Sequence, residues 1–154
     1  MKGQDEFKND LLEALSNIIR TYHLFIVDTD HHHIQLAGRD FALNIAFVRE
    51  GLSLSYFDLR PRPNRHDYAL GHYLVQVRHV PLLADYVRND HEDYLLGLWR
   101  HEMIWLVYAL ENHAQDILRG DRRWQAGYQF TPMDCADGRY GEALKVVERR
   151  ATPP

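Results

Sequence analysis

Residues 90–120, DHEDYLLGLWRHEMIWLVYALENHAQDILRG, predict a long helix at the centre of the fold. Eight consecutive apolar residues, MIWLVYAL (103–110), occupy the middle of this stretch. A helix that is apolar around most of its circumference is covered on several sides. We therefore expect a helix over about 91–119 that lies between other layers of the structure. Asp90 is suited to cap its start, and Gly120 suits the left-handed position after its end.

Glu102 lies on the same helical stripe as the apolar residues that we expect in the core, and so does His113. Three interpretations of the carboxylate are open. It is a buried acid with a raised pKa that takes part in acid–base catalysis, an acid paired internally with an Arg, Tyr or His, or an acid that faces solvent or a partner. The second is favoured because a buried charge must be paired. The two residues lie about 16 Å apart along a helix and cannot pair directly, but they are the candidate catalytic residues.

Residues 28–33, DTDHHH, are the densest cluster of possible metal ligands. Asp28, His31 and His33 are the candidates, although adjacent strand residues point to opposite faces and a closed site needs further ligands from elsewhere. The favoured alternative is a polar turn between two strands. The stretch HEMIW (101–105) has a tryptophan where a zinc protease has its second histidine. We therefore expect neither a metal nor another cofactor.

Residues 41–60, FALNIAFVREGLSLSYFDLR, carry the clearest strand pattern. Large apolar residues alternate with smaller or polar ones on both sides of a tight turn at Glu50 and Gly51, which predicts a β-hairpin. Two shorter β-rich runs precede it. Together these segments predict an antiparallel meander of three or four strands over about 22–59, and such a sheet can bury one face and expose the other.

Helical patterns lie on both sides of the meander. Apolar residues at helical spacing predict an amphipathic helix over 5–20. Further helices are expected at 67–89, the second of them starting at Pro81. A helix, a meander and then helices are typical of the α+β class. We expect a single domain over residues 1–154, in which the meander packs against the N-terminal helix and the long central helix.

The composition is that of an ordinary globular protein, with 154 residues, 45% hydrophobic and 26% charged side chains and a net charge of −4. An acidic chain without a basic stripe is a poor candidate for nucleic-acid binding. No apolar run approaches the roughly 20 residues that cross a bilayer. The polar N-terminus does not resemble a signal peptide, and Cys135 is the only cysteine, so we expect the cytoplasm.

Aromatic and arginine side chains are frequent in or beside the predicted loops. Tyr, Trp and Arg carry much of the binding energy in protein interfaces. The alternative is that they pack beneath the loops as part of the core. The candidate partner-binding residues are Tyr56, Arg60, Arg62, Tyr68, Trp124 and Tyr128.

The hairpin at 41–60, with an amphipathic helix before it and helices after it, resembles the small immunity proteins of bacterial polymorphic and contact-dependent toxin systems. The resemblance covers the general layout of about residues 5–110. It implies a cytoplasmic, non-enzymatic protein that binds a cognate toxin domain and blocks its active site or a movement that the toxin needs. It assigns no role to an individual residue.

Two classes of function follow. The leading hypothesis is a protein-binding module that neutralises a cognate bacterial toxin by direct binding, because the sequence has no recognisable catalytic motif and many aromatic residues near loops. The alternative is a small enzyme or ligand-binding domain with a pocket near Glu102 and His113.

Overall fold

The computed structural model describes residues 2–61, 63–88, 93–128, 133–134 and 141–151. Helices and strands alternate in groups, as expected of the α+β class. Their order is α1 (Lys2–Ala14), α2 (Ser16–Thr21), β1 (Phe25–Asp30), β2 (His33–Ala37), β3 (Phe41–Val48), β4 (Gly51–Asp58), β5 (His66–Tyr68), α3 (Leu70–Gln76), α4 (Tyr94–His113), α5 (Gln115–Leu118), η1 (Arg123–Gly127), β6 (Met133–Asp134) and α6 (Gly141–Ala151).

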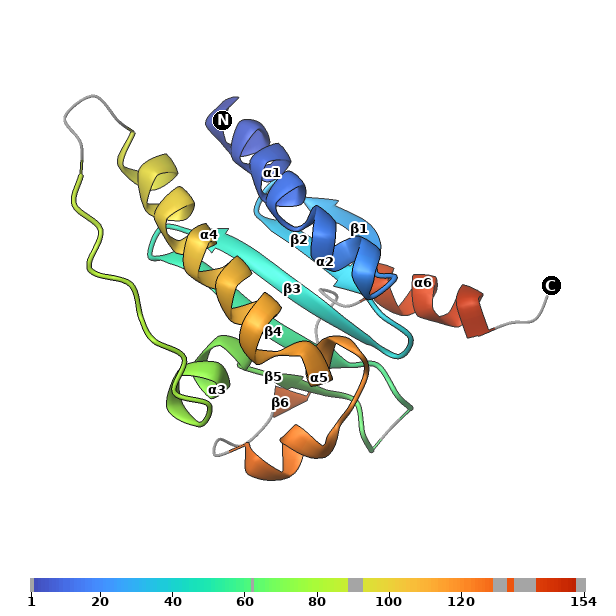
Figure 1. Cartoon of the computed structure of the whole chain (residues 1–154). Helices are drawn as coiled ribbons and strands as arrows, with labels where there is room; N and C mark the ends of the chain where they lie inside the picture. The colour runs from blue at the N-terminus through green and yellow to red at the C-terminus, as the bar shows by residue number, and fades with distance from the viewer. Residues whose placement is uncertain (1, 62, 89–92, 129–132, 135–140, 152–154) are drawn as a thin grey trace.

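The described strands form one antiparallel sheet of six strands in the order β1-β2-β3-β4-β5-β6 (Figure 1). Each strand therefore lies next to its neighbour in sequence. The longest pair is β3 with β4, which runs from Val48 opposite Gly51 to Phe41 opposite Asp58. The predicted hairpin and the meander over 22–59 are confirmed, and the two short strands β5 and β6 extend the sheet beyond it.

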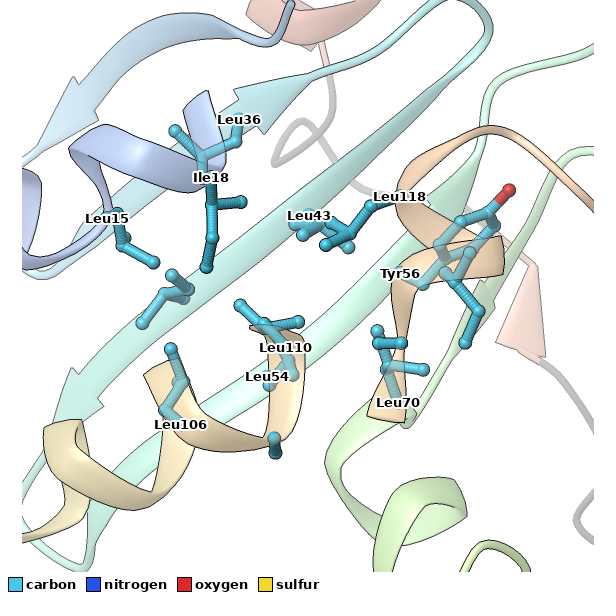
Figure 2. Close-up of a cluster of buried hydrophobic side chains, with 14 of the residues drawn as sticks. Leu15, Ile18, Leu36, Leu43, Leu54, Tyr56, Leu70, Leu106, Leu110 and Leu118 are labelled. Carbon is cyan, nitrogen blue, oxygen red and sulfur yellow. The ribbon is translucent and has the colours of Figure 1, made fainter. Parts of the chain in front are cut away.

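Helices α1 and α4 lie side by side across one face of the sheet (Figure 1). The core lies between these helices and the large residues of the strands, as the alternation in β3 and β4 predicts. Figure 2 shows its centre, where leucines from three layers meet. The N-terminal helices and the connection between them supply Leu15 and Ile18, the sheet supplies Leu36, Leu43 and Leu54, and α4 supplies Leu106 and Leu110.

Helix α6 covers part of the opposite face, over β1 and β2. A second, smaller apolar cluster lies on this face. It consists of Val27, Ala37, Ala42, Phe57, Leu59, Ala143 and Val147. Two buried polar side chains lie on the same face, where the Gln35 amide donates to Asn44 Oδ1 at 3.1 Å. Most of the large buried apolar residues therefore lie on the face of α1 and α4.

The prediction of helices at 67–89 is wrong for most of that range. Only α3 is helical. Tyr68 instead pairs with Tyr56 as part of β5, because the edge of β4 offers it backbone hydrogen bonds. After α3, His79 adopts a positive φ of 53°. Residues 79–88, which we call segment 79–88, have no regular secondary structure and lie beside α4 (Figure 1). Pro81 therefore does not begin a helix.

The long central helix is confirmed, with different ends. Its first residue is Tyr94, and the side chain of Asp93 caps it by accepting the Leu96 N–H at 3.1 Å. Asp90, the predicted cap, lies outside the described residues. The helix breaks at Ala114, where φ is −131°, and α5 continues from there. Gly120 has the predicted left-handed conformation, with φ of 92°.

Candidate functional site

Strand β4 is fully paired on one side and only partly paired on the other. Strand β3 pairs with all eight residues of β4, whereas β5 pairs only with Tyr56 and Phe57. Backbone groups of successive strand residues point alternately to the two sides. The Glu102 carboxylate accepts the Leu52 N–H, so the backbone of Leu52, and by alternation that of Leu54, faces away from β3. Apart from the Leu52 N–H, which Glu102 accepts, the first half of β4 therefore presents a free edge, without a strand partner in the described chain.

Helix α4 fixes the end of the β3–β4 hairpin. Trp99 Nε1 donates to the Val48 carbonyl at 2.8 Å, and Glu102, one turn further along the helix, holds the Leu52 N–H. Gly51 has a φ of 130°, and a Cβ atom there would collide with the Glu102 carboxylate. Only glycine combines this backbone conformation with so close an approach. Gly51 and Glu102 thus depend on each other.

The same helix also holds segment 79–88. His101 Nε2 lies 2.7 Å from the Ala84 carbonyl oxygen, and Trp105 Nε1 donates to the Pro81 carbonyl at 2.8 Å. These side chains satisfy backbone carbonyls that a helix would have satisfied internally. Segment 79–88 is therefore fixed against α4 although it has no regular structure of its own.

Between these two anchored segments lies a cavity of about 640 Å³, which we call the edge groove. The free edge of β4, α3, segment 79–88 and α4 surround it. Its lining is largely apolar, and its charged or titratable side chains are two acids, Asp85 and Glu102, two histidines, His72 and His101, and one tyrosine, Tyr86. The complete lining is Leu52, Ser53, Leu54, Ser55, Ala69, Gly71, His72, Val75, Gln76, Leu82, Leu83, Ala84, Asp85, Tyr86, Leu98, His101, Glu102, Trp105 and Leu106.

Glu102 is partly buried and lines the edge groove. Burial raises the pKa of its carboxyl above the ordinary value, against the opposing effects of the Leu52 N–H and of His101. Its hydrogen-bond partner is a backbone N–H rather than the Arg, Tyr or His of the favoured interpretation. The second carboxylate oxygen leaves an acceptor at the border of the groove.

His113 does not belong to this site. It is the last residue of α4, eleven residues after Glu102, and its ring is 3.5 Å from the Tyr108 hydroxyl. Its carbonyl accepts from Arg78, which also binds the Asp116 carboxylate at 2.7 Å. A pocket exists beside Glu102, but the other candidate residue does not contribute to it.

The aromatic candidates for partner binding form a buried cluster instead of a surface. The rings of Tyr56 and Trp124 are 4.9 Å apart, those of Tyr68 and Trp124 5.1 Å, and those of Tyr68 and Tyr128 4.9 Å. Tyr56, Tyr68 and Trp124 are buried, and Tyr128 is partly exposed. The Tyr128 hydroxyl accepts the Ala69 N–H at 2.8 Å. The cluster ties β4, β5 and η1 together.

Arg60 takes part in a polar network next to this cluster. Its guanidinium lies 2.6 Å from the carboxylate of Asp58, a side chain with no exposed surface, and Gln125 donates to the same carboxylate at 3.0 Å. Burial alone would raise the pKa of Asp58, but the hydrogen bonds from Arg60 and Gln125 outweigh it and lower the pKa. Arg62 lies outside the described residues.

The histidine-rich turn connects β1 and β2, as the alternative to a metal site predicts. Asp30 Oδ1 accepts the His32 N–H at 2.7 Å and lies 2.9 Å from His33 Nδ1. His31 is 3.8 Å from a carboxylate oxygen of Asp5. Asp28 belongs to β1, but its side chain is outside the described part. In the described ranges, no group of three or more His, Cys, Asp or Glu side chains is arranged to hold a metal ion.

The sequence did not reveal the apolar side chains that segment 79–88 and α4 leave exposed. Leu82 is 69% exposed, Val87 83% and Ile104 61%. The expected helix after Pro81 would have buried part of this surface. The feature of the sequence that could have located the groove was Glu102, which lies on the side of α4 that faces the free edge of β4.

No protein-family model, curated protein or solved structure matches the chain. Among the helices of the described residues, none is both long enough and apolar enough to cross a membrane.

Proposed function

We propose that this protein is a binding module that accepts an extended segment of a partner protein in the edge groove. The observation that supports the proposal most directly is the free edge of β4 facing an apolar cavity. A sheet edge offers backbone donors and acceptors in register, and peptides commonly bind by adding a strand to such an edge. The volume of about 640 Å³ lies within the range of real binding sites.

The chemistry of the groove suggests what the segment carries. The leucines of β4 and of segment 79–88 favour apolar side chains pointing inward. The described lining holds two carboxylates, Asp85 and Glu102, and neither lysine nor arginine. Charge complementarity then favours a segment with a lysine or arginine near the apolar residues. The exposed Leu82 adds apolar surface at the rim of the groove.

The resemblance to immunity proteins suggests a biological form for this binding. In that form the partner is a cognate bacterial toxin domain, the complex forms in the cytoplasm, and binding blocks the toxin's active site or a movement that it needs. The acidic net charge of −4 is compatible with a basic partner surface.

Co-expression with the product of the neighbouring open reading frame tests the proposal. We expect a 1:1 complex, and slower hydrogen exchange of the Leu54 amide in the complex than in the free protein. Leu82→Glu and Leu83→Glu place charges in the groove at exposed positions, so they should weaken the complex without unfolding the protein.

Val87→Glu is the matched control, because Val87 is exposed on the same segment but does not line the groove. Ile26→Glu is a second control on β1, at the opposite edge of the sheet, where the side chain is 52% exposed. A complex that resists both groove variants, or an unchanged Leu54 exchange rate on binding, would contradict the edge groove as the docking site.

A second candidate function is a small enzyme or ligand-binding domain that uses the same groove. The observation that favours it is Glu102, a carboxyl with a raised pKa beside a cavity that His72 and His101 also line. Stabilisation of the protein by a small metabolite, abolished by Glu102→Ala and by Leu83→Glu but not by Val87→Glu, would favour this function over the first.

A further inference from the structure

A second cavity lies away from the edge groove, between the β2–β3 turn, the loop after β4 and helix α6. Its volume is about 710 Å³. Its lining combines charged side chains with an apolar wall, in contrast to the leucines of the edge groove. The lining residues are Arg39, Asp40, Leu59, Arg60, Pro61, Arg65, Leu144, Val147 and Glu148, and we call this space the arginine cavity.

Two of the three arginines form no ion pair within the described chain, and Glu148 is the second carboxylate of the lining besides Asp40. Arg60 is bound to Asp58, and the acid of the β2–β3 turn, Asp40, forms an ion pair with Arg122. Across the described residues, no side-chain hydrogen bond or ion pair holds Arg39 or Arg65. The cavity therefore borders two guanidinium groups whose charge is not neutralised by the pairs around them.

Some buried donors lack acceptors as well, and one of them, Arg65 Nε, belongs to the cavity lining. Arg65 Nε and Arg122 Nε are buried and have no hydrogen-bond partner in the described residues, and the same holds for the Tyr56 hydroxyl. Figure 2 shows that hydroxyl directed away from the leucine cluster. Asp40 and Arg60, which line the cavity, are among the charges that act on Tyr56. A buried donor without an acceptor is unfavourable, so such groups normally meet water or a ligand.

We propose that the arginine cavity binds the phosphate group of a small organic molecule through Arg39 and Arg65. A phosphate monoester carries close to two negative charges near neutral pH, which matches two guanidinium groups better than a single carboxylate does. The planar guanidinium presents parallel N–H groups to phosphate oxygens. Leu59, Leu144 and Val147 form the apolar wall for the rest of the molecule. The site is independent of the edge groove, so either can fail without the other.

The test uses the full chain with inorganic phosphate and pyrophosphate as probes, and acetate at matched ionic strength as the reference. We expect saturable binding of at least one phosphate probe, measured by calorimetry and by the NMR shift of the Arg65 Nε–H. Arg65→Gln and Arg39→Gln should each weaken it about tenfold or more, because each removes a charge-assisted hydrogen bond. Arg39 is exposed, so its replacement does not threaten folding.

Arg123→Gln is the matched control, because Arg123 is highly exposed and paired with Asp121 away from the cavity lining. It should bind the probes as the unmodified protein does. Arg65→Lys separates charge from geometry, and we expect partial retention of binding. The proposal is overturned if neither phosphate probe binds, if acetate at matched ionic strength produces the same response, or if Arg39→Gln and Arg65→Gln bind as tightly as the control.

Discussion

The two halves of strand β4 have opposite surroundings. At the end of the strand, Tyr56 and Asp58 are covered by β5, the aromatic cluster and the Arg60 network. At its start, Leu52 and Leu54 border an open groove. The closed half pairs its backbone with β5 and its Asp58 carboxylate with Arg60, whereas the open half keeps backbone and apolar groups available. Aromatic and charged residues therefore stabilise the fold in the closed half, and leucines border the candidate binding site in the open half.

The largest expected effect is that of Trp124→Ala in the closed half. The Trp124 ring is buried and contacts four tyrosines, so its removal leaves a large cavity. We expect a loss of about 3–5 kcal/mol in the free energy of unfolding, measured by urea denaturation. Trp105→Ala is the counterpart in the open half, where the ring is partly exposed, and it should cost clearly less. Equal losses would remove the distinction between the halves.

A smaller loss is expected for Asp58→Asn, which leaves the Arg60 guanidinium without its carboxylate. Breaking a buried ion pair costs about 3–5 kcal/mol, and the partial exposure of Arg60 places this case nearer 2–3 kcal/mol. Because the folded-state pKa of Asp58 is lowered, its contribution is complete above the ordinary value of 3.8 and is lost as the pH falls through the folded pKa.

Urea denaturation of both proteins between pH 7 and pH 2 checks this dependence. The difference in the free energy of unfolding between the two proteins should be constant at the upper end of this pH range and should disappear at the lower end. Asp121→Asn is the control, because its pair with Arg123 lies at the surface, and it should leave stability unchanged. A difference that persists undiminished at the lowest pH would contradict the role given to the Asp58 carboxylate.

The sequence predicts the hairpin and the long helix because their patterns are local. The alternation at 41–60 and the apolar run at 103–110 each define an apolar surface within a short stretch of sequence. Any layer that packs against this surface can bury it. Strand β5 is different, since three residues from His66 form a strand only because β4 offers them an edge. Segment 79–88 likewise depends on two side chains of α4 for its carbonyl hydrogen bonds. Neither dependence is visible within a short window of sequence.

The candidate site was predictable to a similar extent. Glu102 stands out as a carboxylate among core positions, and the structure places it beside a cavity. The groove itself exists because β5 is short and segment 79–88 is not helical, which are the two features that local patterns missed. The aromatic residues were conspicuous by composition, but composition does not distinguish rings that contact each other, such as Tyr68 and Trp124, from rings that face a partner.

Gly51→Ala probes the anchor of the open half. The substitution forces a side chain into a backbone conformation with φ of 130° and against the Glu102 carboxylate. We expect a loss of about 1–3 kcal/mol in the free energy of unfolding, measured by thermal and urea denaturation. In a Glu102→Ala background the collision disappears and only the backbone cost remains, so the double-mutant cycle should show coupling.

Gly71→Ala serves as the matched control for this cycle. A Cβ atom there makes ordinary contact with Leu54 at 3.8 Å, and alanine is the better residue within helix α3. Its stability should be equal or slightly higher. If Gly51→Ala were as harmless as Gly71→Ala, the hairpin would not be fixed by the contact between Gly51 and Glu102.

The smallest expected effect on stability is that of Glu102→Gln. The amide oxygen can still accept the Leu52 N–H, so the change at pH 7 should be less than about 1 kcal/mol. Its sign follows from the raised pKa of Glu102. Between the ordinary value of 4.5 and the folded pKa, the folded protein binds more protons than the unfolded chain, so the stability of the unmodified protein falls as the pH rises through that window.

Glu102→Gln lacks this dependence and should be equally or slightly more stable above the window, as urea denaturation from pH 4 to pH 8 can measure. If Glu102→Gln is at least as stable as the unmodified protein, the hairpin does not need the negative charge of Glu102. If the same variant then binds the partner segment more weakly than the unmodified protein, the carboxylate serves the partner's cation. If instead Glu102→Gln lowers stability at every pH, Glu102 belongs with Asp58 among the groups that hold the fold together, and the open half of β4 is less free than its surroundings suggest.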